Sequence, residues 1–380
     1  MNVVENLAAF LRSQGHEIEF FFPGRALVLH RSTFLGFPAA RLRLTVPFGQ
    51  PNPIRSALAF PVLFPIMLFQ LLVFLRRQRI QIINLHYLVD SFFYFAICKR
   101  LLSLPLVTSL HGSDAFYKGR PRERYSRPFK FALRFSDLII LPCDAYRKLL
   151  VSVFPGVQAK SKFIHNGVDL RRFSSAQTGQ SIDSLGRYIL CIAYLEDYKG
   201  IDILLNAAKP LLAGDSSLKL IIAGDGPRRR DLEHLASSLR IQSQTEFVGS
   251  QGSTEIAKLL QGCELLVLPS REEAFGIVIL EAMASKRAVV ATAVGGIPEV
   301  IEHEVSGILV EPENPTALCE GLRRVLTNSA LKNRLAENGH TRVNRFSIDL
   351  NGAAYQAAFA SLLGFPLPSN SRSEVSANRA

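Results

Sequence analysis

The sequence predicts an α/β protein built from two doubly wound, Rossmann-like domains. Its 380 residues are enough for two domains of ordinary size with full cores. An apolar content of 48 % with 20 % charged residues is typical of a globular chain. From residue 187 onward, short apolar strands alternate with helical stretches, which indicates a parallel sheet with helices on both faces. Ligands of such sheets collect at the carboxyl ends of the strands.

The first half of the chain opens on a helix. Residues 3–13 are predicted to form an amphipathic helix that ends at Gly15, and a strand follows over 17–22. An open sheet of this type normally begins with a strand and a Gly-rich turn. We therefore expect that the chain lacks about one strand and one loop at its N-terminus, through a misassigned start codon or true loss.

The other elements follow from apolar runs and their punctuation. In the first half, strands are expected near 40–46, 80–85, 106–109, 137–141 and 162–165, with a helix over 90–102. In the second half, strands are expected near 187–193, 218–223, 245–248, 264–269, 288–292 and 307–310. Residues 346–363 are predicted to form a final helix.

An uncharged segment of 19 residues, 57–75, is the most unusual part of the sequence. It is bracketed by Arg55 and by three arginines within 76–79. Its length permits a marginal membrane span, but we expect Pro61 and Pro65 to break its first half. Three interpretations stay open: a true span, a helix that lies in a membrane interface, and a plain core-facing helix.

The positive charge of the chain, +12 in total, lies in its first half. Residues 1–180 hold 24 Lys and Arg against 9 Asp and Glu, a net of +15, which leaves −3 for residues 181–380. That half also holds 21 of the 26 Phe residues. A basic and Phe-rich domain favours an anionic membrane surface as partner. Nucleic acid is not expected, because no nucleic-acid-binding motif is visible, and a solvated basic surface is the remaining alternative.

The cysteines are widely spaced and mostly embedded in apolar runs, which indicates core thiols in a reducing compartment. They are Cys98, Cys143, Cys191, Cys263 and Cys319. No clustered Cys, His or carboxylate pattern predicts a structural metal, and no signal peptide is visible. We therefore expect no metal, no cofactor and a cytoplasmic location. Together with the basic first half, this predicts a chain that is peripheral to the inner face of the membrane.

The stretch from Pro269 to Glu281 runs from a buried strand through a loop into an apolar helix. Gly276 and Ile277 are expected in the first helical turn, where unpaired backbone N–H groups and the helix dipole favour a phosphate. Glu281 lies about one turn further among apolar neighbours, so its carboxylate needs a salt bridge, solvent or a ligand such as a vicinal diol. An ordinary surface position on a half-buried helix is the alternative.

This stretch resembles the E-x7-E motif of family 4 retaining glycosyltransferases, with Glu273 and Glu281 as the two carboxylates and the usual Glu-Ala-Met-Ala continuation. The resemblance implies a GT-B fold, in which two Rossmann-like domains face a cleft. It further implies that Glu281 holds the ribose hydroxyls of a sugar nucleotide and that Glu273 contacts the transferred sugar. The backbone amides of Phe275, Gly276 and Ile277 would bind the diphosphate.

Two more candidates follow strand ends. His111 comes after the strand at 106–109, and although a lone histidine is more often packed or solvated, residues 110–114 resemble the family's His-Gly-x-Asp loop, which implies a place near the transferred sugar. Lys199 follows the strand at 187–193 and can supply a point charge to a diphosphate, with a surface lysine as the alternative. The family usually has Arg where this chain has Tyr194, so half of the expected cationic pair is missing.

These observations predict five segments. They are an N-terminal acceptor-side domain over 1–173, a linker over 174–186, a C-terminal nucleotide-sugar-binding domain over 187–345, a helix over 346–365 that returns to the first domain, and a tail over 366–380.

The predicted function is transfer of a sugar, with retention, from a UDP- or GDP-sugar donor to a hydroxyl acceptor. Lipid-linked acceptors are among those expected, and the expected setting is polysaccharide or glycolipid biosynthesis. His111 and Glu273 are the expected catalytic residues, and the expected donor-binding residues are Lys199, Phe275, Gly276, Ile277 and Glu281. A catalytically impaired GT-B subunit that acts as a binding or scaffolding protein is the alternative, because of Tyr194 and the absent first strand.

Overall fold

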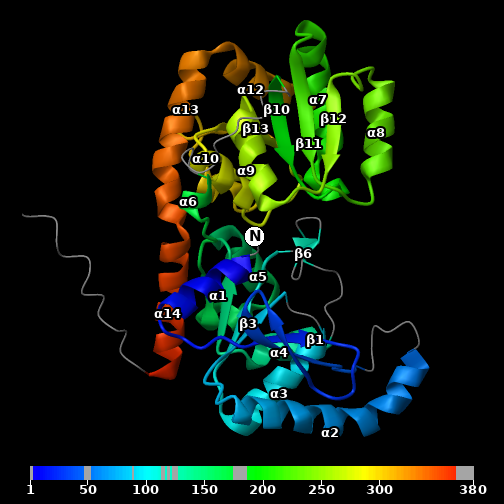
Figure 1. Cartoon of the computed structure of the whole chain (residues 1–380), viewed down its shortest axis with the longest axis vertical. Coiled ribbons are helices and arrows are strands. Elements are labelled where there is room, and N and C mark those ends of the chain that lie inside the picture. Colours follow the sequence, from blue (N-terminus) through cyan, green and yellow to red (C-terminus); the bar gives the residue numbers. More distant parts are fainter. Residues whose placement is uncertain are drawn as a thin grey trace, which may run out of the picture.

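The computed structural model of the chain describes residues 3–46, 53–87, 90–112, 116–117, 120–121, 127–173 and 186–364. Within these residues the chain forms two α/β domains that follow one another along the long axis of the molecule (Figure 1). This confirms the predicted architecture of two Rossmann-like domains. The predicted linker, except Gly186, and the predicted tail lie outside the described residues, as does Asp114 of the His-Gly-x-Asp loop.

The C-terminal domain is built on a six-stranded, fully parallel sheet with the order β12-β11-β10-β13-β14-β15. Its strands are β10 (Arg187–Ile192), β11 (Leu218–Ala223), β12 (Thr245–Gly249), β13 (Leu265–Leu268), β14 (Ala288–Thr292) and β15 (Ile308–Val310). The order of the strands reverses between β10 and β13. In a doubly wound sheet, the crevice at such a reversal is the place where ligands bind.

Alternating side chains of these strands enter two separate cores. Ile189 of β10 belongs to the core that includes Leu204 of α7 and Leu322 of α12, while its neighbour Leu190 belongs to the core that includes Leu280 of α10. Burial on both faces explains why the strands are almost entirely apolar. The helices of this domain are α7 (Ile201–Gly214), α8 (Arg229–Ser238), α9 (Ser253–Gly262), α10 (Ile277–Ala284), α11 (Ile297–Val300), α12 (Pro315–Thr327) and α13 (Ser329–Arg342).

The N-terminal domain has two principal sheets where a single sheet was expected. The parallel sheet β4-β5-β8-β9 contains β4 (Ile83–His86), β5 (Leu106–Ser109), β8 (Leu138–Leu141) and β9 (Ser161–Phe163). The second sheet, β1-β3-β2, contains β1 (Phe20–Pro23), β2 (His30–Phe34) and β3 (Phe37–Leu42), and a short ribbon pairs β6 (Phe116–Tyr117) with β7 (Arg120–Pro121). Among the described residues no strand precedes α1 (Val3–Ser13).

Strand β2 was not predicted from the sequence. It forms an antiparallel hairpin with β3 through Leu35 and Gly36, which both have positive φ angles, as the tight turns of hairpins require. The sequence of β2, His-Arg-Ser-Thr-Phe, is polar and half exposed. An edge strand of this kind lacks the apolar periodicity from which the other strands were recognised.

The helix α2 (Pro53–Arg77) is continuous, so the expected break at Pro61 and Pro65 is wrong. Both prolines lie on the exposed side of the helix, where carbonyl oxygens that lose an intrahelical partner can be hydrated. The opposite side, with Met67 and Leu71, is fully buried in the domain core. This packing stabilises the helix despite the two missing N–H donors.

The remaining helices of the N-terminal half are α3 (Phe93–Leu102), α4 (Arg127–Phe135), α5 (Asp144–Val153) and α6 (Leu170–Phe173), with 3-10 turns at Asp90–Phe92 and Pro155–Lys160. After α13 and the 3-10 turn Val343–Phe346, helix α14 (Ile348–Leu363) runs down one side of the molecule beside α1 (Figure 1). Gly352 allows this close approach, since a Cβ there would lie 2.1 Å from the ring of Phe10. Asn351 donates from Nδ2 to the carbonyl oxygen of His165 at 2.6 Å.

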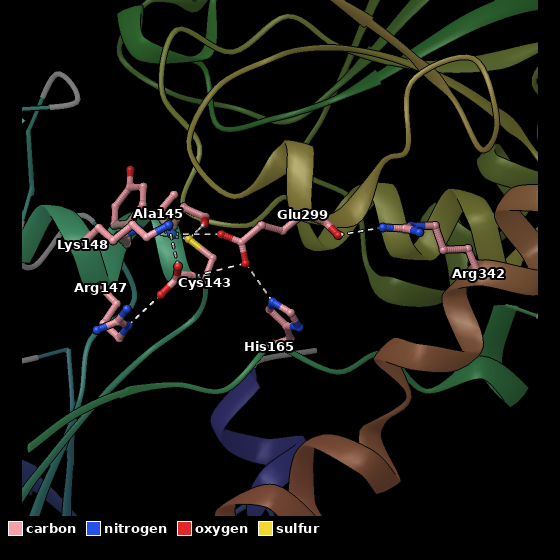
Figure 2. A network of polar contacts seen from close by, with 10 residues as sticks. Cys143, Ala145, Arg147, Lys148, His165, Glu299 and Arg342 are labelled. Carbon is pink, nitrogen blue, oxygen red and sulfur yellow. Dashed lines mark hydrogen bonds and ion pairs between the residues drawn. The ribbon is translucent and has the colours of Figure 1, made fainter.

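Glu299, on α11 of the C-terminal domain, joins the two domains (Figure 2). Its carboxylate accepts hydrogen bonds from the backbone N–H groups of Asp144 and Ala145, at 3.1 and 2.9 Å, and so caps the N-terminus of α5. It also lies 2.9 Å from Nε2 of His165. The Arg342 guanidinium binds the backbone carbonyl of Glu299 at 3.1 Å. A carboxylate at a helix N-terminus accepts hydrogen bonds from backbone N–H groups that lack intrahelical partners. Its negative charge also interacts favourably with the helix dipole.

We expect Glu299→Ala to destabilise the protein by about 1 to 2 kcal/mol, the usual cost of losing a helix cap, and to loosen the contact between the domains. Thermal unfolding would show a lower Tm, and small-angle X-ray scattering would show a larger radius of gyration. Glu320→Ala removes an exposed carboxylate that pairs only within α12 and is the matched control. An unchanged radius and Tm in Glu299→Ala would contradict this role.

Candidate active site

Lys199 and Glu273 form an ion pair at the reversal of strand order. Lys199 ends a 3-10 turn (Asp197–Lys199) that follows β10, and Glu273 lies in the loop after β13. The lysine Nζ is 2.6 Å from Oε2 of Glu273, and both side chains are largely buried. Burial disfavours the ammonium group, but the Glu273 carboxylate outweighs it, and the pKa of Lys199 is raised. Lys199 is therefore a fixed positive charge in the crevice at neutral pH.

The loop that carries Glu273 ends at the N-terminus of α10. Gly276 caps the helix in the left-handed region, with φ of 80°, and Ile277 is its first residue. Phe275 is fully buried, and its ring stacks on His165 with a centroid distance of 5.3 Å, so its side chain is not available to a ligand. Gly295 allows the backbone of the Glu273 loop to lie against it, since a Cβ on residue 295 would lie 1.8 Å from the carbonyl oxygen of Glu273. The helix start lies beside the ion pair, since a Cβ on Gly276 would lie 3.5 Å from Cγ of Glu273, and the first backbone amides of a helix have no intrahelical acceptor.

Glu281 lies about 6 Å further along α10 than Ile277, and both residues line one pocket. This pocket lies between α10, α6 and the start of α1, and its lining includes Asn6, Asp169 and Arg172. Burial raises the pKa of Glu281 to about 7, because a carboxylate loses hydration there. The group is therefore balanced between its neutral and charged forms near neutral pH.

His111 comes from the other domain, at the carboxyl end of β5. The next residue, Gly112, meets the loop of Glu273, since a Cβ on Gly112 would lie 2.6 Å from Cβ of Ala274. The His111 ring stacks on Tyr87 with a centroid distance of 4.2 Å. Two domains thus bring His111, Lys199 and Glu273 to one junction.

A chain of hydrogen bonds runs from the C-terminal helix to His111. The Tyr355 hydroxyl of α14 donates to Oγ of Ser109 at 3.4 Å, and Ser109 donates to Oδ1 of Asn84 at 2.9 Å. The Asn84 amide Nδ2 lies 2.9 Å from Nε2 of His86, and Nδ1 of His86 lies 2.9 Å from Nε2 of His111. His86 and Ser109 are opposite one another in the β4–β5 pairing.

This chain has a direction, which decides where the histidine protons lie. Because Oδ1 of Asn84 accepts from Ser109, its Nδ2 donates to Nε2 of His86. His86 therefore carries its proton on Nδ1 and donates it to Nε2 of His111. The proton of neutral His111 is then on Nδ1. Burial raises the pKa of Tyr355 to about 12, so the first donor of the chain keeps its proton.

Both histidines are neutral at neutral pH. Burial lowers the pKa of His111 to about 4. Burial, together with repulsion from His111 when that ring is protonated, lowers the pKa of His86 to about 3. A neutral imidazole of fixed tautomer positions a ligand through directional hydrogen bonds, and it is a weak proton donor at pH 7. This suits a positioning role for His111 better than general acid catalysis.

The sequence missed His86, Asn84 and Tyr355. His86 ends a strand as His111 does, so the same argument from strand ends would have identified it. Asn84 lies inside the strand, and Tyr355 lies on a helix about 270 residues away in sequence, so only the folded chain shows their part. Tyr194 is 56 % exposed at the end of β10.

We expect His111 to be the Nδ1–H tautomer in the native protein and to lose this preference in His86→Phe, because Nε2 of His111 then has no donor from His86. Two-bond ¹⁵N–¹H correlation spectra of ¹⁵N-histidine-labelled protein distinguish the tautomers. His30→Phe, in the exposed strand β2, is the control and leaves the His111 signals unchanged. An Nε2–H tautomer of His111 in the native protein would overturn the assignment.

The raised pKa of Glu281 predicts a pH-dependent stability. The unfolded carboxyl ionises near 4.5 and the folded one near 7. The free energy of unfolding therefore falls as the pH rises between these values, and it stays at its lower level above about pH 7. Glu281→Gln removes this cost. Its urea midpoint should therefore exceed that of the native chain at about pH 8 and match it near pH 4.5. Glu255→Gln, an exposed change on α9, is the matched control.

Two family models together match most of the chain. Residues 2–172 match the model described as Glycosyltransferase Family 4, and residues 177–342 match the model described as Glycosyl transferases group 1. A glycosyltransferase of Methanocaldococcus jannaschii is 32 % identical over 276 residues, which cover 72 % of this chain and 73 % of that protein. The D-inositol 3-phosphate glycosyltransferase of a Nocardioides species is 28 % identical over 72 % of this chain and 67 % of its own length.

Solved structures share the fold. A glycosyltransferase from Rickettsia africae has a TM-score of 0.73 with 17 % identity, covering 95 % of this chain and 94 % of its own. HepE of Anabaena, solved in complex with UDP-glucose, has a TM-score of 0.67 with 20 % identity and 86 % coverage of both chains. The matches across both halves and the identity to the archaeal relative show that the chain belongs to the family 4, group 1 glycosyltransferases and is an enzyme of the GT-B fold.

Proposed function

We propose that this glycosyltransferase uses a nucleoside-diphosphate sugar, UDP- or GDP-linked, and transfers the sugar to a hydroxyl acceptor with retention at the anomeric carbon. The observation that carries the proposal is the Lys199–Glu273 pair at the reversal of strand order, next to the N-terminus of α10. This crevice combines a fixed cation with unpaired amides, and such groups bind a diphosphate. The complex of the structural neighbour HepE with UDP-glucose supports this donor class.

In the proposed reaction, the bond between the anomeric carbon and the β-phosphate oxygen breaks while the acceptor oxygen bonds to the same face of that carbon. Negative charge develops on the departing diphosphate, where Lys199 and the amides of Gly276 and Ile277 stabilise it. The proton of the acceptor hydroxyl passes to a departing phosphate oxygen. His111, which is neutral, and the carboxylate of Glu273 hold the hydroxyls of the transferred sugar. Glu281 accepts hydrogen bonds from the ribose diol in the pocket that it lines.

The proposed setting is the cytoplasm, in polysaccharide or glycolipid assembly. The five cysteines are free and buried, which suits a reducing compartment. Among the relatives, the D-inositol 3-phosphate glycosyltransferase acts, by its name, on a polyol phosphate, which supports a hydroxyl acceptor. Acceptors on a growing polysaccharide and on a lipid both react through a hydroxyl group, as the proposed transfer requires.

We expect Lys199→Ala to weaken donor binding and to lower kcat by about 10²- to 10³-fold, the usual loss when one charge-stabilising donor is removed. Thermal shift and calorimetry against UDP-, GDP- and ADP-sugars identify the donor, because a ligand of the native state raises its stability. Radiolabelled-sugar transfer then gives kcat and KM. Lys209→Ala, an exposed lysine on α7, is the matched control.

Because Lys199→Ala leaves Glu273 without its cation, the double variant Lys199→Met with Glu273→Gln separates folding from chemistry. It removes both charges and should fold, yet it should still fail to bind the donor. Unchanged kcat/KM in Lys199→Ala would contradict the assigned role. Donor binding without transfer to any hydroxyl would contradict the proposed transfer, and a product with inverted anomeric configuration would contradict retention.

A further inference from the structure

The helix α2 has two apolar faces, and only one of them is covered. Met67, Leu71, Phe74 and Leu75 are at most 6 % exposed and belong to the core of the N-terminal domain. On the other side, large apolar side chains are exposed by 48 to 75 %: these are Leu58, Val62, Ile66 and Phe69. Their spacing of four, four and three residues places them in one stripe along the helix.

The exposed side of α2 is entirely apolar from Ala57 to Phe69. Besides the stripe, its exposed residues are Ala57, Pro61 and Pro65. Single exposed apolar residues are normal, but a continuous apolar surface on a protein marks a contact site. A neighbouring loop enlarges the surface, since Leu27 and Val28 are 47 % and 73 % exposed. Gln70 holds this loop against α2 through bonds to Leu27 and Leu29.

Positive charge adjoins the apolar stripe. Arg76 follows Phe69 by seven residues, or about two turns, and so continues the same side of the helix. Arg76, Arg77 and Arg79 are all exposed, and residues 53–79 contain no Asp or Glu. An apolar face bordered by arginines complements the acyl and phosphate layers of an anionic bilayer. A purely apolar protein partner would gain nothing from the arginines.

By length and composition alone, residues 57–77 could also cross a membrane. The packing argues against a span, because crossing would remove Met67, Leu71 and their neighbours from the domain core and expose that core to water. Lying flat in the interface requires no such change. Figure 1 shows α2 lying across the end of the N-terminal domain that is remote from the C-terminal domain.

We propose that α2 docks the protein in-plane on an anionic lipid surface, with the stripe Leu58, Val62, Ile66 and Phe69 inserted among the acyl chains and Arg76, Arg77 and Arg79 at the lipid phosphates. The proposal concerns a surface remote from the Lys199–Glu273 pair and does not depend on the identity of the donor. Docked in this way, the N-terminal domain lies on the bilayer and the C-terminal domain is held away from it.

The test is co-sedimentation of the full chain with vesicles of phosphatidylcholine alone or with added phosphatidylglycerol, at about 0.01 M and about 0.15 M salt. Binding should require phosphatidylglycerol and weaken at the higher salt. Val62→Asp with Phe69→Asp should lower the binding at least tenfold, and so should Arg76→Glu with Arg77→Glu, since each arginine contributes about fivefold. Circular dichroism and Tm check that the variants fold.

Matched controls lie in the second half of the chain. Leu350→Asp places a charge on an apolar residue of α14 that is 55 % exposed, and Arg230→Glu reverses an exposed charge in α8. Both should bind vesicles as the native chain does. Equal binding to neutral and anionic vesicles, or no binding to either, would overturn the proposal. So would resistance to alkaline extraction, which indicates a span, or a dimer in sedimentation velocity that Phe69→Asp dissociates.

Discussion

The candidate active site depends on contacts that hold one domain against the other, and the carboxylate of Glu299 makes several of them. Glu299 caps α5 across the junction and contacts His165. Beside it, Sγ of Cys143 donates to the carbonyl oxygen of Ala274 at 3.2 Å. This second contact fixes the loop that carries Glu273. The buried ring of Phe275, stacked on His165, anchors the same loop from behind. The position of the Glu273 loop relative to His111 is thus set by contacts between domains.

The electrostatics of the site differ sharply between its two sides. On the C-terminal side, the carboxylate of Glu273 keeps Lys199 charged despite burial. On the N-terminal side, burial keeps His111 and His86 neutral, and the chain of hydrogen bonds from Tyr355 orders their protons. In the proposed reaction, the charged group would face the departing diphosphate and the neutral groups would face the sugar hydroxyls, as each partner needs.

The sequence predicted the fold well where strands are buried on both faces. All six strands of the C-terminal sheet were located within one or two residues, because parallel strands between helices are continuous apolar runs. It was less successful in the N-terminal domain. There it missed the polar edge strand β2, and it expected Pro61 and Pro65 to interrupt a helix that packing keeps continuous. The roles of the predicted site residues stay predictions until the variants are measured.

The sequence by itself determined most of the elements, the residues of the loop between Pro269 and Glu281 and the presence of an uncharged helical segment, since these follow from local periodicity and from motifs a few residues long. Only the tertiary structure decided that Lys199 pairs with Glu273, 74 residues away, that His86 orders the proton of His111, and that one face of α2 is packed while the other is bare. These properties depend on which strands become neighbours and which faces meet the core. Such contacts join residues far apart in the chain, so no local pattern specifies them.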